Sequence, residues 1–174
     1  GNIAEPCTTV AGATPFTHVF LNWNPLGHPP DSIYTLPHFD IHFYLISSAE
    51  RDAIMPTDTV KGGKVPDATL VPSGYINGVE VVPMMGVHWI DVTSPEFAGQ
   101  QFTRTLIWGY WDGKQAFIEP MITKAFIESK VADVKDIRQP SAFSKAGYYP
   151  TKYSTSYDAA AKEDTSALKE FVKH

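Results

Sequence analysis

The chain is poor in cysteine, in charge and in long apolar runs. Its one cysteine, Cys7, excludes an internal disulfide, so the fold depends on its core. Charged residues make up only 19% of the chain, and the formal net charge is -5 with no cluster of basic residues. Nucleic acids and anionic membranes attract concentrated lysine and arginine, so we expect neither as a partner. No apolar run approaches the roughly 18 residues of a transmembrane segment.

Apolar and aromatic residues are plentiful, at 43% and 13% of 174 residues. This is enough for one core, so we expect one domain over residues 1–174, with 1–16 as a flexible N-terminal segment. Cys7 lies in that segment and fits a surface thiol better than a catalytic one. The chain begins at Gly1 without methionine, which favours export to the periplasm or the medium after leader removal. The alternative is a truncated cytoplasmic domain.

Fourteen prolines and twelve glycines divide the chain into short segments rich in Val, Ile, Phe, Tyr, Trp and Thr. That pattern is typical of a mainly β (α+β) fold, and we expect an antiparallel β-barrel, cupin-like or calycin-like, with one or two short helices. Asp112-Gly113 predicts a two-residue hairpin turn. Strands are expected at residues 17–23, 38–45, 87–92, 102–111 and 115–122.

Helices and loops are expected between these strands. Ser47 or Ser48 can cap a short helix over 49–55. Residues 123–131 form another helical turn. Residues 57–78 read as a long loop. The C-terminal part is ambiguous, because 149–157 alternates like a strand whereas 159–172 has good helix propensity.

The pattern His38-x-Asp40-x-His42 places three metal-binding side chains on one face of the strand over 38–45. Residues two apart in a strand lie about 7 Å apart and can share an ion, whereas residues four apart usually cannot. Asp40 is therefore expected to share an ion with one of the two histidines, or to orient a ligating histidine.

Two other strands offer further ligands. His88 follows Gly86, which permits close backbone approach, and Glu119 lies within an apolar strand where a carboxylate needs a partner. We therefore expect a divalent metal ion, Zn, Mn, Fe, Ni or Cu, bound among His38, Asp40, His42, His88 and Glu119. The alternative is a structural polar network in which Glu119 pairs with His88 or Arg104.

The remaining candidates receive less weight. His18 is a possible extra ligand but fits a structural role better, and His28 in Gly27-His28-Pro29-Pro30 fits a surface loop. Tyr44 and Arg104 are candidate polar groups near an open coordination position. Four aromatic residues could form a ligand platform but more often belong to a core: Trp89, Trp108, Tyr110 and Trp111.

Five motifs stand out by their wording and order: residues 38–44 (HFDIHFY), 83–89 (PMMGVHW), 118–124 (IEPMITK), 139–140 (QP) and 147–150 (GYYP). Together they resemble one bacterial family of domains of unknown function whose type member comes from Thermus. The resemblance covers about residues 38–157 and is loose over the first 35 residues. It implies an exported or lipid-anchored protein with a β-rich fold, a C-terminal hairpin and assembly into a ring-like homo-oligomer.

These observations predict a metal-binding domain that would perform metal-assisted hydrolysis or lyase chemistry if it is an enzyme. Two alternatives stay open. One is a non-catalytic, oligomeric envelope or binding protein with a structural polar network, and the other is a barrel that binds a small apolar ligand.

Overall fold

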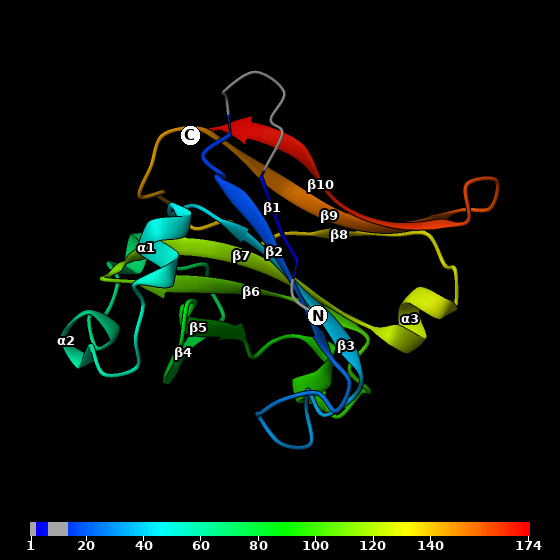
Figure 1. Cartoon of the computed structure of the whole chain (residues 1–174), viewed down its shortest axis with the longest axis horizontal. Coiled ribbons are helices and arrows are strands. Elements are labelled where there is room, and N and C mark those ends of the chain that lie inside the picture. The colour runs from blue at the N-terminus through cyan, green and yellow to red at the C-terminus, as the bar shows by residue number, and fades with distance from the viewer. Residues whose placement is uncertain (1–2, 7–13) are drawn as a thin grey trace.

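The computed structural model describes residues 3–6 and 14–174, and it shows two antiparallel sheets (Figure 1). The larger sheet has the strand order β1-β2-β3-β7-β6-β5-β4, and the smaller has the order β10-β9-β8. The strands of the larger sheet are β1 (Ile3–Pro6), β2 (His18–Asn24), β3 (His38–Tyr44), β4 (Tyr75–Val82), β5 (Gly86–Asp91), β6 (Arg104–Trp111) and β7 (Lys114–Thr123). Those of the smaller are β8 (Asp133–Asp136), β9 (Tyr148–Asp158) and β10 (Glu163–Lys173).

The mainly β prediction is confirmed, and β2, β3, β5, β6 and β7 lie where strands are expected. The turn at Asp112-Gly113 joins β6 to β7, as predicted. Among the described strands no closed barrel is seen, because β1 and β4 are the two edges of the larger sheet. The cupin-like or calycin-like barrel type is therefore not confirmed.

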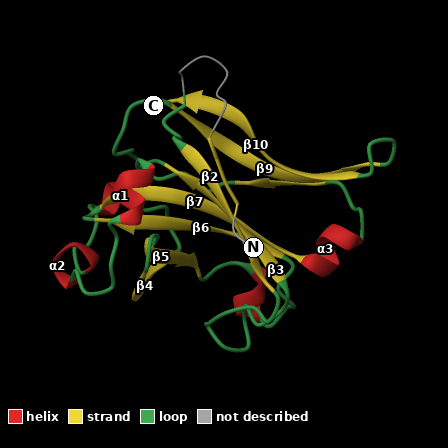
Figure 2. Cartoon of the chain, in the orientation of Figure 1, coloured by secondary structure: helices red, strands yellow, loops and turns green. Residues whose placement is uncertain are grey.

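Three short helices lie at the ends of the sheets: α1 (Ser48–Asp52), α2 (Thr59–Gly62) and α3 (Lys124–Glu128) (Figure 2). Ser47 caps α1 through a capping box in which its side chain accepts from the Glu50 backbone N–H. This helix ends at Asp52, earlier than the sequence indicates. Thr123 caps α3, where Lys124 and Glu128 form the expected ion pair.

The prediction of a long loop over residues 57–78 is wrong. That stretch contains α2, the 3-10 helix Ala68–Leu70 and the start of β4. Asn77-Gly78 reads as a turn, but it lies inside β4, where the register with β5 shifts between Asn77 and Val81 and Val79 adopts a φ of 62°. The irregularity is a bulge rather than a strand end. The short strand β8 is also missing from the sequence-based expectations.

The C-terminal part forms the hairpin that the family resemblance implies. β9 and β10 pair from Tyr148 opposite Lys173 to Asp158 opposite Glu163. The hairpin resolves the ambiguity of the C-terminal part: the helix propensity of residues 159–172 is not realised, and these residues form the turn and β10. Asp158 Oδ1 accepts hydrogen bonds from the backbone N–H groups of Ala160 and Ala161, at 2.8 and 3.1 Å, which closes the turn instead.

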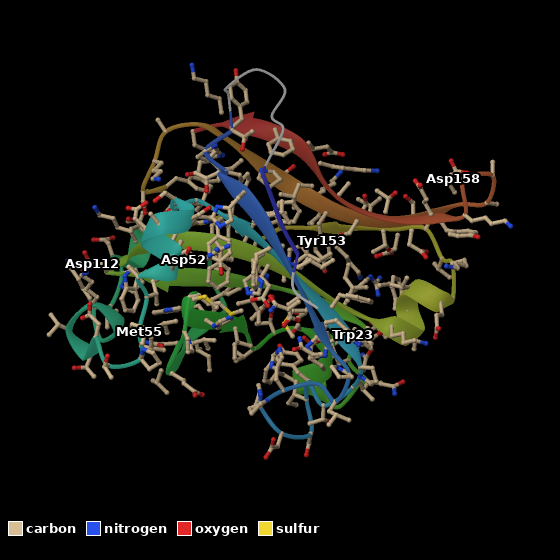
Figure 3. All side chains as sticks on the ribbon, in the orientation of Figure 1. Trp23, Asp52, Met55, Asp112, Tyr153 and Asp158 are labelled. Atoms are coloured by element: carbon tan, nitrogen blue, oxygen red, sulfur yellow. The ribbon has the colours of Figure 1, made fainter. Side chains whose placement is uncertain are left out.

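The smaller sheet packs on one face of the larger, and the main apolar core lies between them. β6 contributes Trp108 and β9 contributes Tyr153, which is labelled in Figure 3. Trp108, Tyr110 and partly buried Trp89 pack in or against this core, as the core interpretation predicts, and Trp111 packs on a second cluster. The opposite face of the larger sheet carries the polar side chains of β3.

Within the described residues, no helix is long and apolar enough to cross a membrane. Cys7 and much of the segment 1–16 lie outside the described residues, so the expectations about a flexible segment and a surface thiol stay predictions.

Candidate metal centre

The alternation predicted for β3 places its polar side chains on the buried face. His38 and His42 are 0% exposed and Asp40 is 5% exposed, whereas Phe39, Ile41 and Phe43 are only partly buried. The face of β3 that carries the histidines is thus more deeply buried than the face that carries its phenylalanines and isoleucine. This is unusual, because buried polar side chains require partners.

The predicted ligands divide into two clusters rather than one. The His42 cluster consists of His42, His88 and Glu119, and the His28 cluster consists of His28, His38 and Asp40. In each cluster the potential ligand atoms all lie within 4.8 Å of one another. The structure therefore brings the predicted ligands together with His28 as two three-residue groups rather than one.

The His42 cluster joins three strands. The antiparallel register, with Phe43 opposite Ile118, brings His42 of β3 beside Glu119 of β7. His42 Nε2 lies 3.4 Å from Glu119 Oε1, and His88 Nε2 lies 3.3 Å from Glu119 Oε2. Both carboxylate oxygens of Glu119 thus face an imidazole.

Glycine allows His88 to reach Glu119 across an intervening strand. His88 of β5 lies opposite Gly109 of β6, which in turn lies opposite Phe117 of β7. Gly109 has no side chain to fill the space between β5 and β7. Gly86 behaves as predicted: its φ is +104°, and a Cβ there would lie 2.6 Å from the Tyr110 carbonyl oxygen.

Pro120 interrupts the sheet next to Glu119. The residue pairs between β3 and β7 stop at Asp40–Met121 and resume at Phe43–Ile118. Proline has no N–H to donate, and within sheets it is normally confined to edges and bulges. Pro120 lies in a central strand, so the hydrogen bonds between β3 and β7 are interrupted next to the His42 cluster.

Three polar atoms of the His42 cluster lack a well-oriented hydrogen bond among the described residues. His42 Nδ1 and Nε2 and Glu119 Oε2 are buried without a partner of hydrogen-bonding geometry. Burial lowers the pKa of His42, and the charge of Glu119 only partly opposes this effect. The neutral imidazole keeps a lone pair, which a metal ligand requires.

The His28 cluster adds a role that the surface-loop interpretation of His28 missed. His28 does lie on a loop, with 33% of its side chain exposed, but its ring contacts Asp40. His38 Nε2 lies 3.1 Å from Asp40 Oδ1, and His28 Nε2 lies 3.4 Å from Asp40 Oδ2. The two imidazole rings have centroids 4.7 Å apart. His28 follows a tight turn at the end of β2, and that glycine turn was the available signal that the histidine is held in place.

The pKa values of two residues in the His28 cluster, His28 and Asp40, are shifted from their ordinary values. Burial alone would lower the pKa of His28, but contacts with Asp40 and the Pro29 carbonyl outweigh it and raise the pKa to about 9. Burial alone would raise the pKa of Asp40, but His28 and His38 hold it below its ordinary value. Asp40 is therefore an anion, and in the absence of metal a protonated His28 balances its charge at neutral pH. A metal ion bound here would displace that proton.

Two residues of each cluster line one cavity of about 490 Å³, which is within the usual size range of small-molecule sites. They are His28 and Asp40 from one cluster and His88 and Glu119 from the other, whereas His38 and His42 lie behind the lining residues. Strand β4 forms part of its wall through Gly78, Glu80 and Val82. The other lining residues that matter here are Asn22, Asn24, His28, Asp40, His88 and Glu119.

Other predicted polar groups lie outside the clusters. Arg104 is bound to Asp133, with Nε 2.5 Å from Oδ2, so the expectation that it lies near the metal or pairs with Glu119 is wrong. The Tyr44 hydroxyl donates to the Met84 carbonyl at 2.9 Å. His18 stacks on Tyr44 with ring centroids 4.7 Å apart, which fits the structural role expected of it.

Comparisons with protein-family models, curated proteins and solved structures gave no match. The functional interpretation therefore depends on the geometry of the chain itself. The resemblance to the Thermus-typed family stays an expectation.

Each cluster supplies two imidazoles and one carboxylate. This donor set binds Zn²⁺ and the other first-row divalent ions, and three protein ligands leave coordination positions open toward the cavity. The arrangement can thus hold an ion where a small molecule has access to it.

Proposed function

We propose that this chain is a metal-binding protein in which His42, His88 and Glu119 hold a divalent ion, of the Zn, Mn, Fe, Ni or Cu group, at the base of the cavity. The observation that carries this proposal is the convergence of three ligand atoms within 4.8 Å of one another. His42 and Glu119 are fully buried, at 0% and 1% exposure, and His88 is partly buried. A carboxylate at that depth needs a cation or charged hydrogen-bond partner, and the described residues that line the cavity offer histidines but no lysine or arginine.

The reaction class that suits this site is metal-assisted hydrolysis or lyase chemistry on a small molecule. A divalent ion bound there would polarise a carbonyl or phosphoryl oxygen and lower the pKa of water. His42, His88 and Glu119 would hold the ion, while the apolar residues Ile90 and Ile107 of the cavity wall would limit access of bulk water.

Metal content tests the proposal. Natively folded protein without an affinity tag is analysed by plasma mass spectrometry beside His42→Ala and His88→Ala. His18→Ala is the matched control, because His18 is also buried but lies outside both clusters. We expect near-stoichiometric metal in the wild type and the control, with loss in both cluster variants. Metal-free wild-type protein that also fails to bind added Zn²⁺ would refute the proposal.

The second candidate function is a non-catalytic, oligomeric envelope or binding protein in which the same residues form a structural network. The contacts of 3.3 and 3.4 Å between Glu119 and its two histidines support it, since they also suit imidazole–carboxylate pairs. If this candidate is right, a chelator should leave the stability of the wild type unchanged. The His42→Ala and His88→Ala variants should only lower the melting temperature.

The family resemblance supports two further proposals: export to the periplasm or medium, with or without a lipid anchor, and assembly into a homo-oligomer. The cupin-like or calycin-like type of sheet rests on the strand pattern of the sequence alone and also stays a proposal. Sedimentation velocity of the purified chain tests the assembly into a homo-oligomer. A monomer at micromolar concentration would contradict it.

A further inference from the structure

The structure points to a second metal site: we propose that His28, His38 and Asp40 bind their own divalent ion, so that two ions face the same cavity. This inference deepens the proposed function, since it concerns the same cavity. Its ligands are nevertheless distinct from those of the His42 cluster, and the two sites can fail separately.

The two histidines are oriented as metal ligands usually are. His38 Nδ1 lies 2.6 Å from the Leu36 carbonyl oxygen, and His28 Nδ1 lies 2.7 Å from the Pro29 carbonyl oxygen. A carbonyl only accepts, so each Nδ1 carries the proton. Both rings therefore present Nε2 toward Asp40, which is the arrangement in which a backbone carbonyl fixes the tautomer of a ligating histidine.

Asp40 is oriented in the same way. Asn24 Nδ2 donates to Asp40 Oδ2 at 2.6 Å, which holds the carboxylate in place and leaves Oδ1 toward His38. His38 Nε2 and Asp40 Oδ1 are both buried, and neither has a hydrogen-bond partner among the described residues despite their separation of 3.1 Å. A separation of 3.1 Å suits two ligands that converge on one metal ion, and it also suits a direct imidazole–carboxylate pair. Titration with zinc distinguishes the two arrangements.

The loop that carries His28 is built to hold it. The Gly27 N–H donates to the Asn24 carbonyl at 3.2 Å, and the His28 N–H donates to the Tyr34 carbonyl at 3.0 Å. Gly27 has a φ of +68°, and a Cβ there would lie 2.1 Å from the Tyr34 oxygen. The turn therefore requires glycine, and it places the next residue over β3.

The two sites are neighbours. Asp40 and His42 lie two residues apart on the same face of β3, which separates their Cα atoms by about 7 Å. The cavity wall brings three carboxylates together, those of Asp40, Glu80 and Glu119. Two divalent ions would more than balance these charges, so the loaded cavity would favour a ligand with an anionic oxygen, such as a phosphate or a carboxylate group.

Native mass spectrometry during titration with Zn²⁺ tests the second site. The wild type should bind two ions per chain and the buried control His18→Ala should also bind two. His28→Ala and Asp40→Asn should each bind one. His28 lies on a partly exposed loop and Asn is isosteric with Asp, so both variants should fold, as circular dichroism will check. Co²⁺ absorption should show histidine coordination in each variant that retains one ion.

The outcomes separate the two proposals. One ion in the wild type that His88→Ala removes and His28→Ala does not would overturn the second site and leave the proposed function intact. One ion that His28→Ala removes and His88→Ala does not would overturn the His42 site and support this one. Two ions in both His28→Ala and Asp40→Asn would overturn the ligand assignment made here.

Discussion

The ring of Phe117 occupies the space above Gly109, its partner across β6 and β7. A Cβ at Gly109 would lie 2.1 Å from Phe117 Cε1. The same ring packs against two candidate ligands, with centroids 4.9 Å from His42 and 5.1 Å from His88. Phe117 therefore sets the positions of both imidazoles, and it fits only because its neighbour has no side chain.

Gly109→Ala should displace the Phe117 ring toward His42 and His88. We expect a loss of about 1–3 kcal/mol in the free energy of unfolding from overpacking. We also expect metal affinity to fall about 10–100-fold, as when supporting groups around a metal are disturbed. Urea unfolding and competition with a chromogenic chelator measure the two effects. The double variant Gly109→Ala/Phe117→Leu should regain affinity, and a double variant as weak as the single one would contradict the mechanism.

Glu119→Gln distinguishes a metal site from a structural network. Without metal, we expect this variant to be as stable as the wild type or more stable by on the order of 1 kcal/mol, because a buried charge is removed. With saturating Zn²⁺, only the wild type should gain strongly in melting temperature. Thermal unfolding with Zn²⁺ and with EDTA checks this. A loss of about 3–5 kcal/mol in EDTA would instead indicate that the carboxylate is paired with charged histidines.

Gly27→Ala should disturb the His28 site without changing any ligand. The added Cβ meets the Tyr34 backbone, so the turn must move and His28 with it. We expect a cost of about 1–2 kcal/mol from the left-handed backbone, and zinc binding that falls from two ions per chain to one. Gly99→Ala is the matched control, because Gly99 also has positive φ but no atom lies within 4 Å of its Cβ position. The control should lose stability while binding both ions; equal zinc loss in the two variants would rule out a local effect.

Stability should fall steeply at alkaline pH. Burial raises the pKa of Tyr149 to about 12, against about 10 in an unfolded chain. Between these values the unfolded state has released the proton and the folded state has not, so each pH unit costs about 1.4 kcal/mol for this group. Burial also raises the pKa values of Tyr34, Tyr44, Tyr75, Tyr110 and Tyr153.

Ultraviolet absorbance of tyrosinate, recorded beside circular dichroism, checks this prediction. We expect these tyrosines to ionise together with loss of the fold above pH 10. Gradual ionisation of all tyrosines near pH 10 with the fold intact would show that the rings are not buried as described.

The sidedness of β3 follows directly from its sequence, because the two-residue period of a strand assigns His38, Asp40 and His42 to one face. Their division into two clusters does not follow. The division depends on the register of β3 against β7 and on the reach of His88 from β5 across Gly109. Both are set by the tertiary structure and cannot be derived from local sequence. His28 was missed for the same reason: only the path of the loop after β2 brings it over Asp40.

The fold shows a similar division. Short β-rich segments with strong turn signals were predicted correctly, as at Asp112-Gly113. Signals that conflict with tertiary structure led to errors. Asn77-Gly78 is a turn by composition but a bulge within β4, and the alanines after Asp158 favour a helix but form the tip of a hairpin, because pairing with β9 outweighs local propensity.

The edge position of β4 has a kinetic consequence. Among the strands that the structure describes, β4 pairs only with β5, and its register shifts between Asn77 and Val81. Its hydrogen bonds should therefore break at a lower free-energy cost than those of β3 or β7. Because β4 forms one wall of the cavity, its detachment would uncover His88 while the central strands stay paired. A bound ion would then leave at the frequency of this local opening, and a chelator would strip the folded protein at the rate at which the amides of β4 exchange with deuterium.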